Sequence, residues 1–160
     1  MGPAALRAIR SWVRLDRALR AFDAEVRRGF GVSGLQLALL RILAERSPMR
    51  LAELRRSLVL HPATVGQAVD ALVEAGLCER ARDREDGRAW VLSVTPAGRD
   101  LIARAPLAGP VRLRSARVSR SRLDRLATAL EDAIDLFGLA RWAPPLPATA
   151  DPRERRRRET

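Results

Sequence analysis

The feature that most limits the possible folds is a pattern of two short helices followed by a hairpin, between residues 50 and 94. The segment RLAELRRSLVLHPATVGQAVDALVEAGL, residues 50–77, contains two short helical patterns joined at LVL. Pro62 suits the first position of the second helix, because its missing N–H would have no helical partner there. Gly76 is placed to end that helix. Two helices joined so tightly predict a helix-turn-helix, although many helical hairpins share the pattern and bind nothing.

The next residues predict a β-hairpin. LCERAR can form one strand, DREDG a turn in which Gly87 supplies the unusual backbone angles, and RAWVLSV the returning strand. Side chains alternate along the second strand, so one side of the hairpin can pack on the helices. The tip then projects into solvent with four arginines, Arg80, Arg82, Arg84 and Arg88. A helix-turn-helix followed by a charged hairpin is a winged helix.

The charged residues at the tip allow two interpretations. Asp83, Glu85 and Asp86 can neutralise the arginines in surface salt bridges, which would leave an ordinary solvated turn. An exposed ion pair contributes only about 0–1 kcal/mol, too little to explain so dense a cluster as a device for stability. We therefore favour a tip that binds an anionic partner.

The overall charge favours nucleic acid as that partner. The chain has 160 residues, a formal net charge of +11, and 30 basic residues that are all arginine. The planar guanidinium suits phosphates and guanine edges, so DNA is the leading partner and an anionic membrane surface the second. The absence of lysine also fits a GC-rich genome, so the choice of base carries less weight than the charge.

Several classes of protein are disfavoured by what the chain contains. Cys78 is the only cysteine and His61 the only histidine, so a disulfide framework, a zinc site and a metal cofactor are not expected. We find no phosphate-binding loop and no nucleophile–base pair, which predicts that the chain is not an enzyme and needs no cofactor. No hydrophobic run approaches membrane-spanning length and no signal peptide is apparent, so a cytoplasmic location is expected.

Helices are also predicted on both sides of the winged helix. Apolar residues recur at steps of three and four before GFGVS, residues 29–33, which indicates one long amphipathic helix. Ser33 can cap the following helix. A further helix begins at Pro96, and Pro106 with Gly109-Pro110 predicts a kink or break after it. Ser119 can cap the last helix, whose apolar stripe favours packing over ligand binding; the stripe comprises Leu123, Leu126, Leu130, Ile134 and Phe137.

At this point the sequence resembles a known family. RLAELRRSL, ATVGQAVDALVEAGLCERAR and above all DREDGRAWVLSVTPAG are similar to the core of the MarR-type transcriptional regulators, over about residues 6–141. The resemblance implies a homodimer held by the first and the last two helices, without catalytic activity. It implies binding to pseudo-palindromic operators, usually as a repressor. It also implies release of DNA when a small aromatic or phenolic ligand, an oxidant or a metal arrives.

Site residues can be carried over one at a time. Asp86 and Arg88 match the wing Asp-x-Arg of the family, in which the acid braces an arginine that reaches the minor groove. Thr64 matches a threonine near the start of the recognition helix. Gln67 stands where many relatives have arginine and Gly66 where they have serine or threonine, so the operator sequence cannot be carried over. Gly66 either allows the backbone to approach DNA closely, or is merely tolerated although it lowers the stability of the helix by about 0.8–1.0 kcal/mol relative to alanine.

The spacing of the recognition helix separates two faces. Val65, Val69 and Leu72 point inward, which leaves His61, Thr64 and Gln67, with Ala63 and Ala68, toward the groove. Together with the wing, the predicted DNA-binding residues are His61, Thr64, Gln67, Arg80, Arg82, Arg84 and Arg88, with Asp86 supporting the wing. Cys78 lies at the base of the wing, where a small apolar residue would pack, so a redox role is disfavoured.

The prediction as a whole is a mainly α protein with a small β-hairpin wing. Residues 1–141 form one domain, with the winged helix-turn-helix at about 35–95 and dimerisation helices at 6–28 and 96–141. Residues 142–160 form a Pro/Arg-rich flexible tail. The expected function is sequence-specific binding of double-stranded DNA by a homodimeric regulator that a small aromatic or phenolic ligand releases. The alternative is a winged-helix module that binds an acidic protein or an anionic surface.

Overall fold

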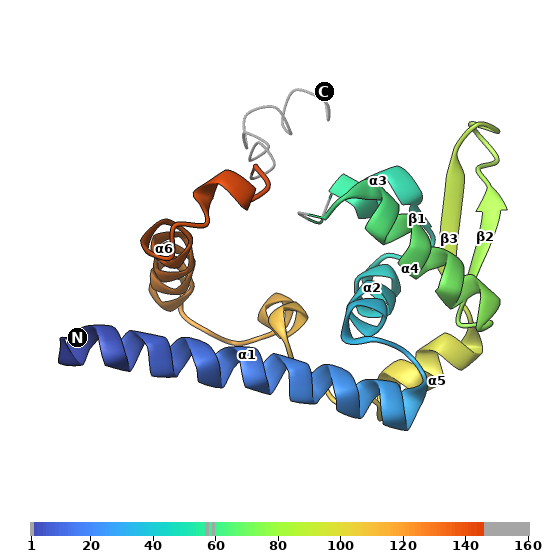
Figure 1. Ribbon diagram of the computed structural model, residues 1–160. Coiled ribbons are helices and arrows are strands. Elements are labelled where there is room, and N and C mark those ends of the chain that lie inside the picture. Colours follow the sequence, from blue (N-terminus) through green and yellow to red (C-terminus); the bar gives the residue numbers. More distant parts are fainter. Residues whose placement is uncertain (1, 57, 59, 146–160) are drawn as a thin grey trace.

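The computed structural model describes residues 2–56, 58 and 60–145, in which helices surround a small antiparallel sheet (Figure 1). In chain order the elements are α1 (Pro3–Phe30), α2 (Gly34–Glu45), β1 (Met49–Arg50), α3 (Leu51–Arg56), α4 (Pro62–Glu74), β2 (Cys78–Arg82), β3 (Trp90–Val94), α5 (Pro96–Arg104), the short 3-10 helix η1 (Pro110–Arg114), α6 (Arg120–Leu136) and η2 (Ala140–Trp142). The predicted fold class, mainly α with a β-hairpin wing, is confirmed. The expected tail lies largely outside the described residues, which end at Pro145.

The junction between α1 and α2 follows from three local signals. Gly31 adopts the left-handed region, with φ of 71°, and ends α1. Ser33 and Gln36 form a reciprocal capping box: the Gln36 N–H donates to Ser33 Oγ at 3.1 Å, and the Ser33 N–H donates to Gln36 Oε1 at 2.7 Å. Asp23 on α1 accepts a further bond at 2.7 Å from the N–H of Gly34. The start of α2 is therefore tied to α1.

Helix α2 forms the centre of the hydrophobic core. It packs against α1, α4, α5, β3 and η1. Because neighbours surround it, apolar residues are buried on more than one side of the helix: Leu37, Leu39, Leu40, Ile42 and Leu43. Around it the inward face of α4 is buried as the sequence predicts, through Val65, Val69 and Leu72.

The sheet has three strands in the order β1-β3-β2, whereas the sequence predicted only the two strands of the hairpin. Met49 pairs with Leu92 and Arg50 with Val91, which places the two-residue β1 beside β3. Two residues are too few to show a strand period, so this strand was missed. Leu92 and Val94 are buried against the helices, as their alternation predicts.

The predicted interruption after α5 is confirmed. Helix α5 ends at Arg104 and only the short η1 precedes α6. Arg41 of α2 satisfies carbonyl groups at this end: its Nη2 donates to the carbonyl oxygens of Ile102 at 3.1 Å and Ala105 at 2.9 Å. Ser119 stands at the N-cap of α6, but its side chain makes no capping bond.

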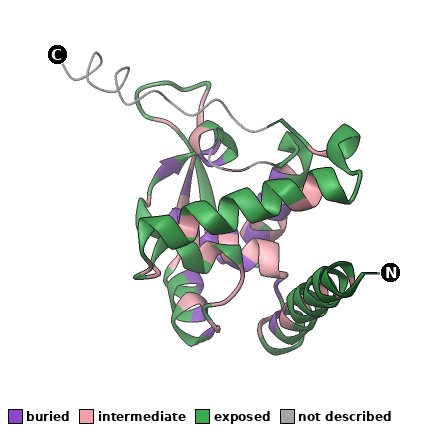
Figure 2. Cartoon of the chain, turned by 90° about the vertical axis from the view of Figure 1, so that its left-hand side faces the viewer, coloured by how far each residue is buried: buried purple, intermediate pink, exposed green. Residues whose placement is uncertain are grey.

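Helices α1 and α6 carry their apolar stripes on the surface of the single chain. Figure 1 shows α6 above the N-terminal half of α1, and the winged helix above its C-terminal half. Figure 2 shows most of α1 as exposed, and no residue of α6 is buried. The rings of Trp12 and Phe137 meet edge to face, with centroids 5.7 Å apart. The exposed apolar residues of this surface are Ile9, Trp12, Val13, Leu15, Leu19, Leu126, Leu130, Leu136, Phe137, Leu139 and Trp142.

In the part of the chain that the structure describes, no helix combines the length and hydrophobicity that crossing a membrane requires.

The close packing around Gly98 predicts that any side chain there would destabilise the protein. A Cβ at this position would lie 2.2 Å from the carbonyl oxygen of Leu77 and 2.9 Å from Val94 Cγ1, so backbone would have to move. The Gly98 N–H also donates to Thr95 Oγ1 at 3.0 Å, which fixes the first turn of α5. We expect Gly98→Ala to lower the free energy of unfolding by about 1–3 kcal/mol, as overpacking does.

Gly66→Ala is the matched control for this measurement. A Cβ at Gly66 would meet only Arg55 Nη2, at 3.7 Å. The substitution should raise the free energy of unfolding by about 0.8–1.0 kcal/mol through helix propensity. Urea denaturation of both variants checks the pair, and equal stabilities for Gly98→Ala and the parent would contradict the close approach.

Candidate nucleic-acid interface

Helix α4 presents a polar N-terminal half to solvent. His61, Thr64 and Gln67 are exposed, as predicted from their spacing. His61 is the N-cap residue, and its Nδ1 accepts from the Ala63 N–H at 3.2 Å. The expectation that Ala68 faces the groove was wrong, because Ala68 belongs to the buried core beside Val69. Helix α4 buries four apolar residues and leaves these polar side chains available to a partner.

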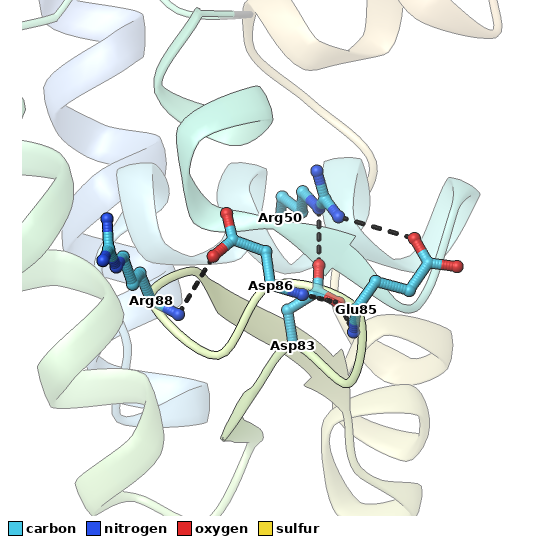
Figure 3. A network of polar contacts seen from close by, with 5 residues as sticks. All are labelled: Arg50, Asp83, Glu85, Asp86 and Arg88. Atoms are coloured by element: carbon cyan, nitrogen blue, oxygen red, sulfur yellow. Dashed lines mark hydrogen bonds and ion pairs between the residues drawn. The ribbon is translucent and has the colours of Figure 1, made fainter.

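The wing is held on one face by an ion-pair cluster around Asp83 (Figure 3). Arg50 of β1 donates from Nε to Asp83 Oδ2 at 2.5 Å, and its Nη2 lies 3.8 Å from Glu85 Oε2. Asp83 Oδ1 also accepts from the N–H groups of Glu85 at 2.9 Å and Asp86 at 3.5 Å. The Asp83 side chain is only 11% exposed. Backbone donation from Glu85, together with the Arg50 guanidinium, lowers the pKa of Asp83 and keeps it charged at neutral pH.

Asp86 contacts the backbone at the wing tip. Its Oδ1 accepts from the N–H of Arg88 at 3.1 Å, two residues along the chain. This is the bond of an Asx turn, which shapes the loop. In Figure 3 the Arg88 guanidinium lies apart from the cluster formed by Arg50. Asp86 is thus placed to set the backbone position of Arg88.

The four predicted wing arginines fall into two pairs. Arg80 and Arg82 are engaged within the protein: both guanidinium groups lie over the Trp90 ring, at 5.0 and 3.9 Å from its centroid. Arg82 Nη1 also donates to the carbonyl oxygen of Arg88 at 3.3 Å. The guanidinium groups of Arg84 and Arg88, in contrast, have no hydrogen bond or ion pair to any residue of the described ranges. Only this second pair is free for an external anion.

Arg80 makes one more contact, to helix α4. Its Nη1 donates to Asp70 Oδ1 on α4 at 2.7 Å. Asp70, Trp90 and Arg50 were missed as parts of this surface, whereas Asp83 was expected to pair with an arginine and does so with Arg50. Asp83, at the start of a turn, carried a local signal for an Asx motif. The Arg80–Asp70 and Arg50–Asp83 bonds join residues 10 and 33 positions apart, for which the sequence carries no local signal.

Cys78 is buried at the base of the wing. Burial raises the pKa of its thiol, which disfavours the reactive thiolate. Within the described residues no group of three or more histidine, cysteine, aspartate or glutamate side chains could hold a metal ion.

A cavity of about 690 Å³ lies between α1, α2 and the segment before η1. Its two charged lining residues are already paired: Asp23 with Arg27 at 2.7 Å, and Arg114 with Glu45 through two bonds of 2.8 and 2.5 Å. The rest of the lining is mostly apolar and comprises Leu19, Phe22, Leu35, Ala38, Ile42, Leu58, Leu60, Ala108, Pro110 and Val111.

Comparison with known proteins bears on this interface. Residues 32–90 match the model of the MarR family, which confirms the resemblance noted in the sequence. No curated protein matches the chain. Among solved structures, a probable transcriptional regulator from Pseudomonas aeruginosa is 28% identical, with a TM-score of 0.51, and the match covers 75% of this chain and 93% of that one.

Two further solved structures share the fold. Reduced AbfR bound to DNA is 20% identical, with a TM-score of 0.59, and the match covers 84% of this chain and 94% of that one. The PcaV transcriptional regulator from Streptomyces coelicolor, in complex with its natural ligand, is 19% identical, with a TM-score of 0.54. That match covers 76% of this chain and 89% of PcaV.

Proposed function

We propose, from the membership of residues 32–90 in the MarR family, that this protein is a cytoplasmic, sequence-specific DNA-binding regulator of transcription. It acts as a homodimer on a pseudo-palindromic operator, as a repressor, and has no catalytic activity. The observation that carries the proposal is the pairing of two surfaces. The exposed polar half of α4 lies in the same winged helix as the wing tip. At that tip the guanidinium groups of Arg84 and Arg88 have no hydrogen bond or ion pair to any residue that the structure describes.

Each exposed residue suits a particular part of DNA. A glutamine amide can donate to N7 and accept from the N6 amino group of adenine, so Gln67 is our candidate for base readout. Thr64 and His61, nearer the start of α4, suit phosphate oxygens or a thymine methyl. Arg84 and Arg88 suit phosphates and the minor groove, with Asp86 supporting the turn between them.

The apolar surface of α1 and α6 supports a homodimer. Leu130 of α6 is 48% exposed and Trp142 of η2 63%, and Trp12, Leu15 and Leu19 of α1 are exposed as well. Monomeric proteins rarely expose large contiguous apolar patches. A second copy that presents the same helices would cover both surfaces through a two-fold contact.

The cavity beside α1 supports a ligand. It borders both the dimerisation helix α1 and the winged helix, so its occupant can alter the angle between them. A neutral aromatic or phenolic ligand can enter without breaking either the Asp23 or the Arg114 ion pair. In one form of the dimer the two recognition helices are spaced to fit DNA, and in another they are not. A ligand that binds the second form more tightly would shift the population toward that form and so release DNA.

The alternative, a module that binds an acidic protein or anionic surface, uses the same arginines but requires no base readout. It predicts equal affinity for all DNA sequences, and the first experiment below separates the two.

Base readout is tested by selecting bound sequences from random DNA and then varying the recovered operator one base pair at a time. We expect a two-fold motif, and Gln67→Ala should relax the preference at one symmetric pair of positions by about 1–3 kcal/mol. Arg84→Ala and Arg88→Ala are the matched variants for phosphate contact. Each should weaken binding to every sequence and reduce the salt slope by about one unit. A selection without any motif would favour the alternative module.

Dimerisation is tested by sedimentation of the parent and of the double variant Leu126→Arg/Leu130→Arg. The parent should be a dimer at micromolar concentration, and the variant a monomer with an intact winged helix, because two charges are placed in an apolar interface. Arg125→Ala, on the same helix, is the control and should stay dimeric. A parent that is a stable monomer and still binds a palindrome tightly would contradict the assembly.

Ligand binding is tested by titrating a panel of phenolic and neutral aromatic compounds while melting temperature and operator affinity are recorded. At least one compound should raise the melting temperature and weaken operator binding. Ala38→Phe, which adds a ring to the cavity lining, should abolish both effects. If both effects persist in Ala38→Phe, the ligand binds elsewhere; no response to any compound would favour constitutive binding.

A further inference from the structure

The contacts between the wing and the recognition helix assign a separate task to two of the arginines. Arg80 and Arg82 lie on the same face of β2, two residues apart, and Trp90 pairs directly with Arg82 across the sheet. Both guanidinium groups lie over the Trp90 ring, at a distance where cation–π attraction acts. Trp90 therefore holds these side chains beside α4, away from Arg84 at the tip.

The acid that Arg80 contacts occupies a sensitive position. Asp70 stands one turn beyond Gln67 on α4, and its side chain is 53% exposed. A carboxylate on the exposed part of a recognition helix repels the phosphates of DNA when it is unpaired. The 2.7 Å bond from Arg80 neutralises that charge.

We propose that Arg80 is an internal shield for Asp70 and does not itself contact a DNA phosphate, with Trp90 as the positioning residue that holds Arg80 in place. The proposal rests on the DNA-binding function and refines it. An exposed ion pair contributes little to stability, so the effect of this pair is expected in DNA binding and not in folding. The winged helix thus has two arginines that bind phosphate and one that neutralises its own recognition helix.

The test is a double-mutant cycle measured as affinity for operator and for random duplex DNA. The four proteins are the parent, Arg80→Gln, Asp70→Asn and the double variant. Arg80→Gln should weaken binding, because it leaves Asp70 unpaired near the phosphates. The same change should have almost no effect in the Asp70→Asn background. We expect a coupling of about threefold or more, within the range for residues of one ion-pair network.

Arg84→Gln, made in the parent and in Asp70→Asn, is the matched control. Arg84 has no ion pair with Asp70, so its loss of affinity should be the same in both backgrounds. Equal losses for Arg80→Gln in both backgrounds would overturn the shield and return Arg80 to the phosphate contacts. If Trp90 positions Arg80, Trp90→Leu should weaken DNA binding in the parent and have no further effect in the Arg80→Gln background. Trp90→Phe, which keeps an aromatic ring, should retain part of the affinity.

The failures of the two proposals are distinguishable. A parent that binds no DNA contradicts the proposed function and the shield together. A parent that binds its operator with an additive cycle contradicts the shield alone. Thermal melts of the Arg80, Asp70 and Arg84 variants should agree closely with the parent, and a large loss of stability in Asp70→Asn would assign the pair to folding, against the proposal.

Discussion

The burial of α2 on several sides is the constraint on which the rest of the structure depends. Five of its apolar side chains are buried, and α1, α4, α5, β3 and η1 all pack on it. A helix enclosed in this way cannot rotate without moving its neighbours, because protein interiors are close-packed. Helices α4 and α1 are consequently held by the same central element. Any change in the angle of α1 has a direct route to α4.

Beyond its base, the wing is held by ion pairs and not by the apolar core. The base of the hairpin reaches the core through Cys78, Leu92 and Val94, and Trp90 packs against the edge of the core. Beyond it, Arg50 holds Asp83 on one face of the hairpin, and Asp70 with Trp90 holds Arg80 on the other. Ion pairs on both faces limit the tilt of a ribbon that projects into solvent. The same arginine-rich composition thus serves two purposes, since some guanidinium groups brace the wing and others stay free.

Helices α1 and α6 differ from the wing, because each exposes an apolar stripe in the described part of the chain. There Trp12 of α1 meets Phe137 edge to face, and the C-terminal end of α1 packs on α2. The break after α5 separates α6 from the winged helix and brings the Gly109-Pro110 segment to the wall of the cavity. The predicted break after α5 thus contributes to the shape of the site proposed for a ligand.

Much of the fold could be predicted because its signals are local. Ser33 as a helix cap, Pro62 at the first position of α4, Gly76 as a stop and the alternation around Leu92 each depend on a few neighbouring residues. The exposed polar residues of α4 could be predicted from the helical spacing of its apolar residues. Ala68, at the edge of the apolar stripe, was assigned to the wrong face. Strand β1 was missed because two residues carry no period.

The sequence by itself determined the order of the α-helices and of the two hairpin strands, the inward face of α4 and the concentration of arginine on the wing, because backbone propensity and side-chain period act over short distances. Only the tertiary structure decided which arginines are free. Arg80, Arg82, Arg84 and Arg88 are indistinguishable by composition, and their separation depends on partners such as Asp70, which only folding brings within hydrogen-bonding distance. Charge is a property of a residue, but whether that charge is available is a property of its neighbours in space.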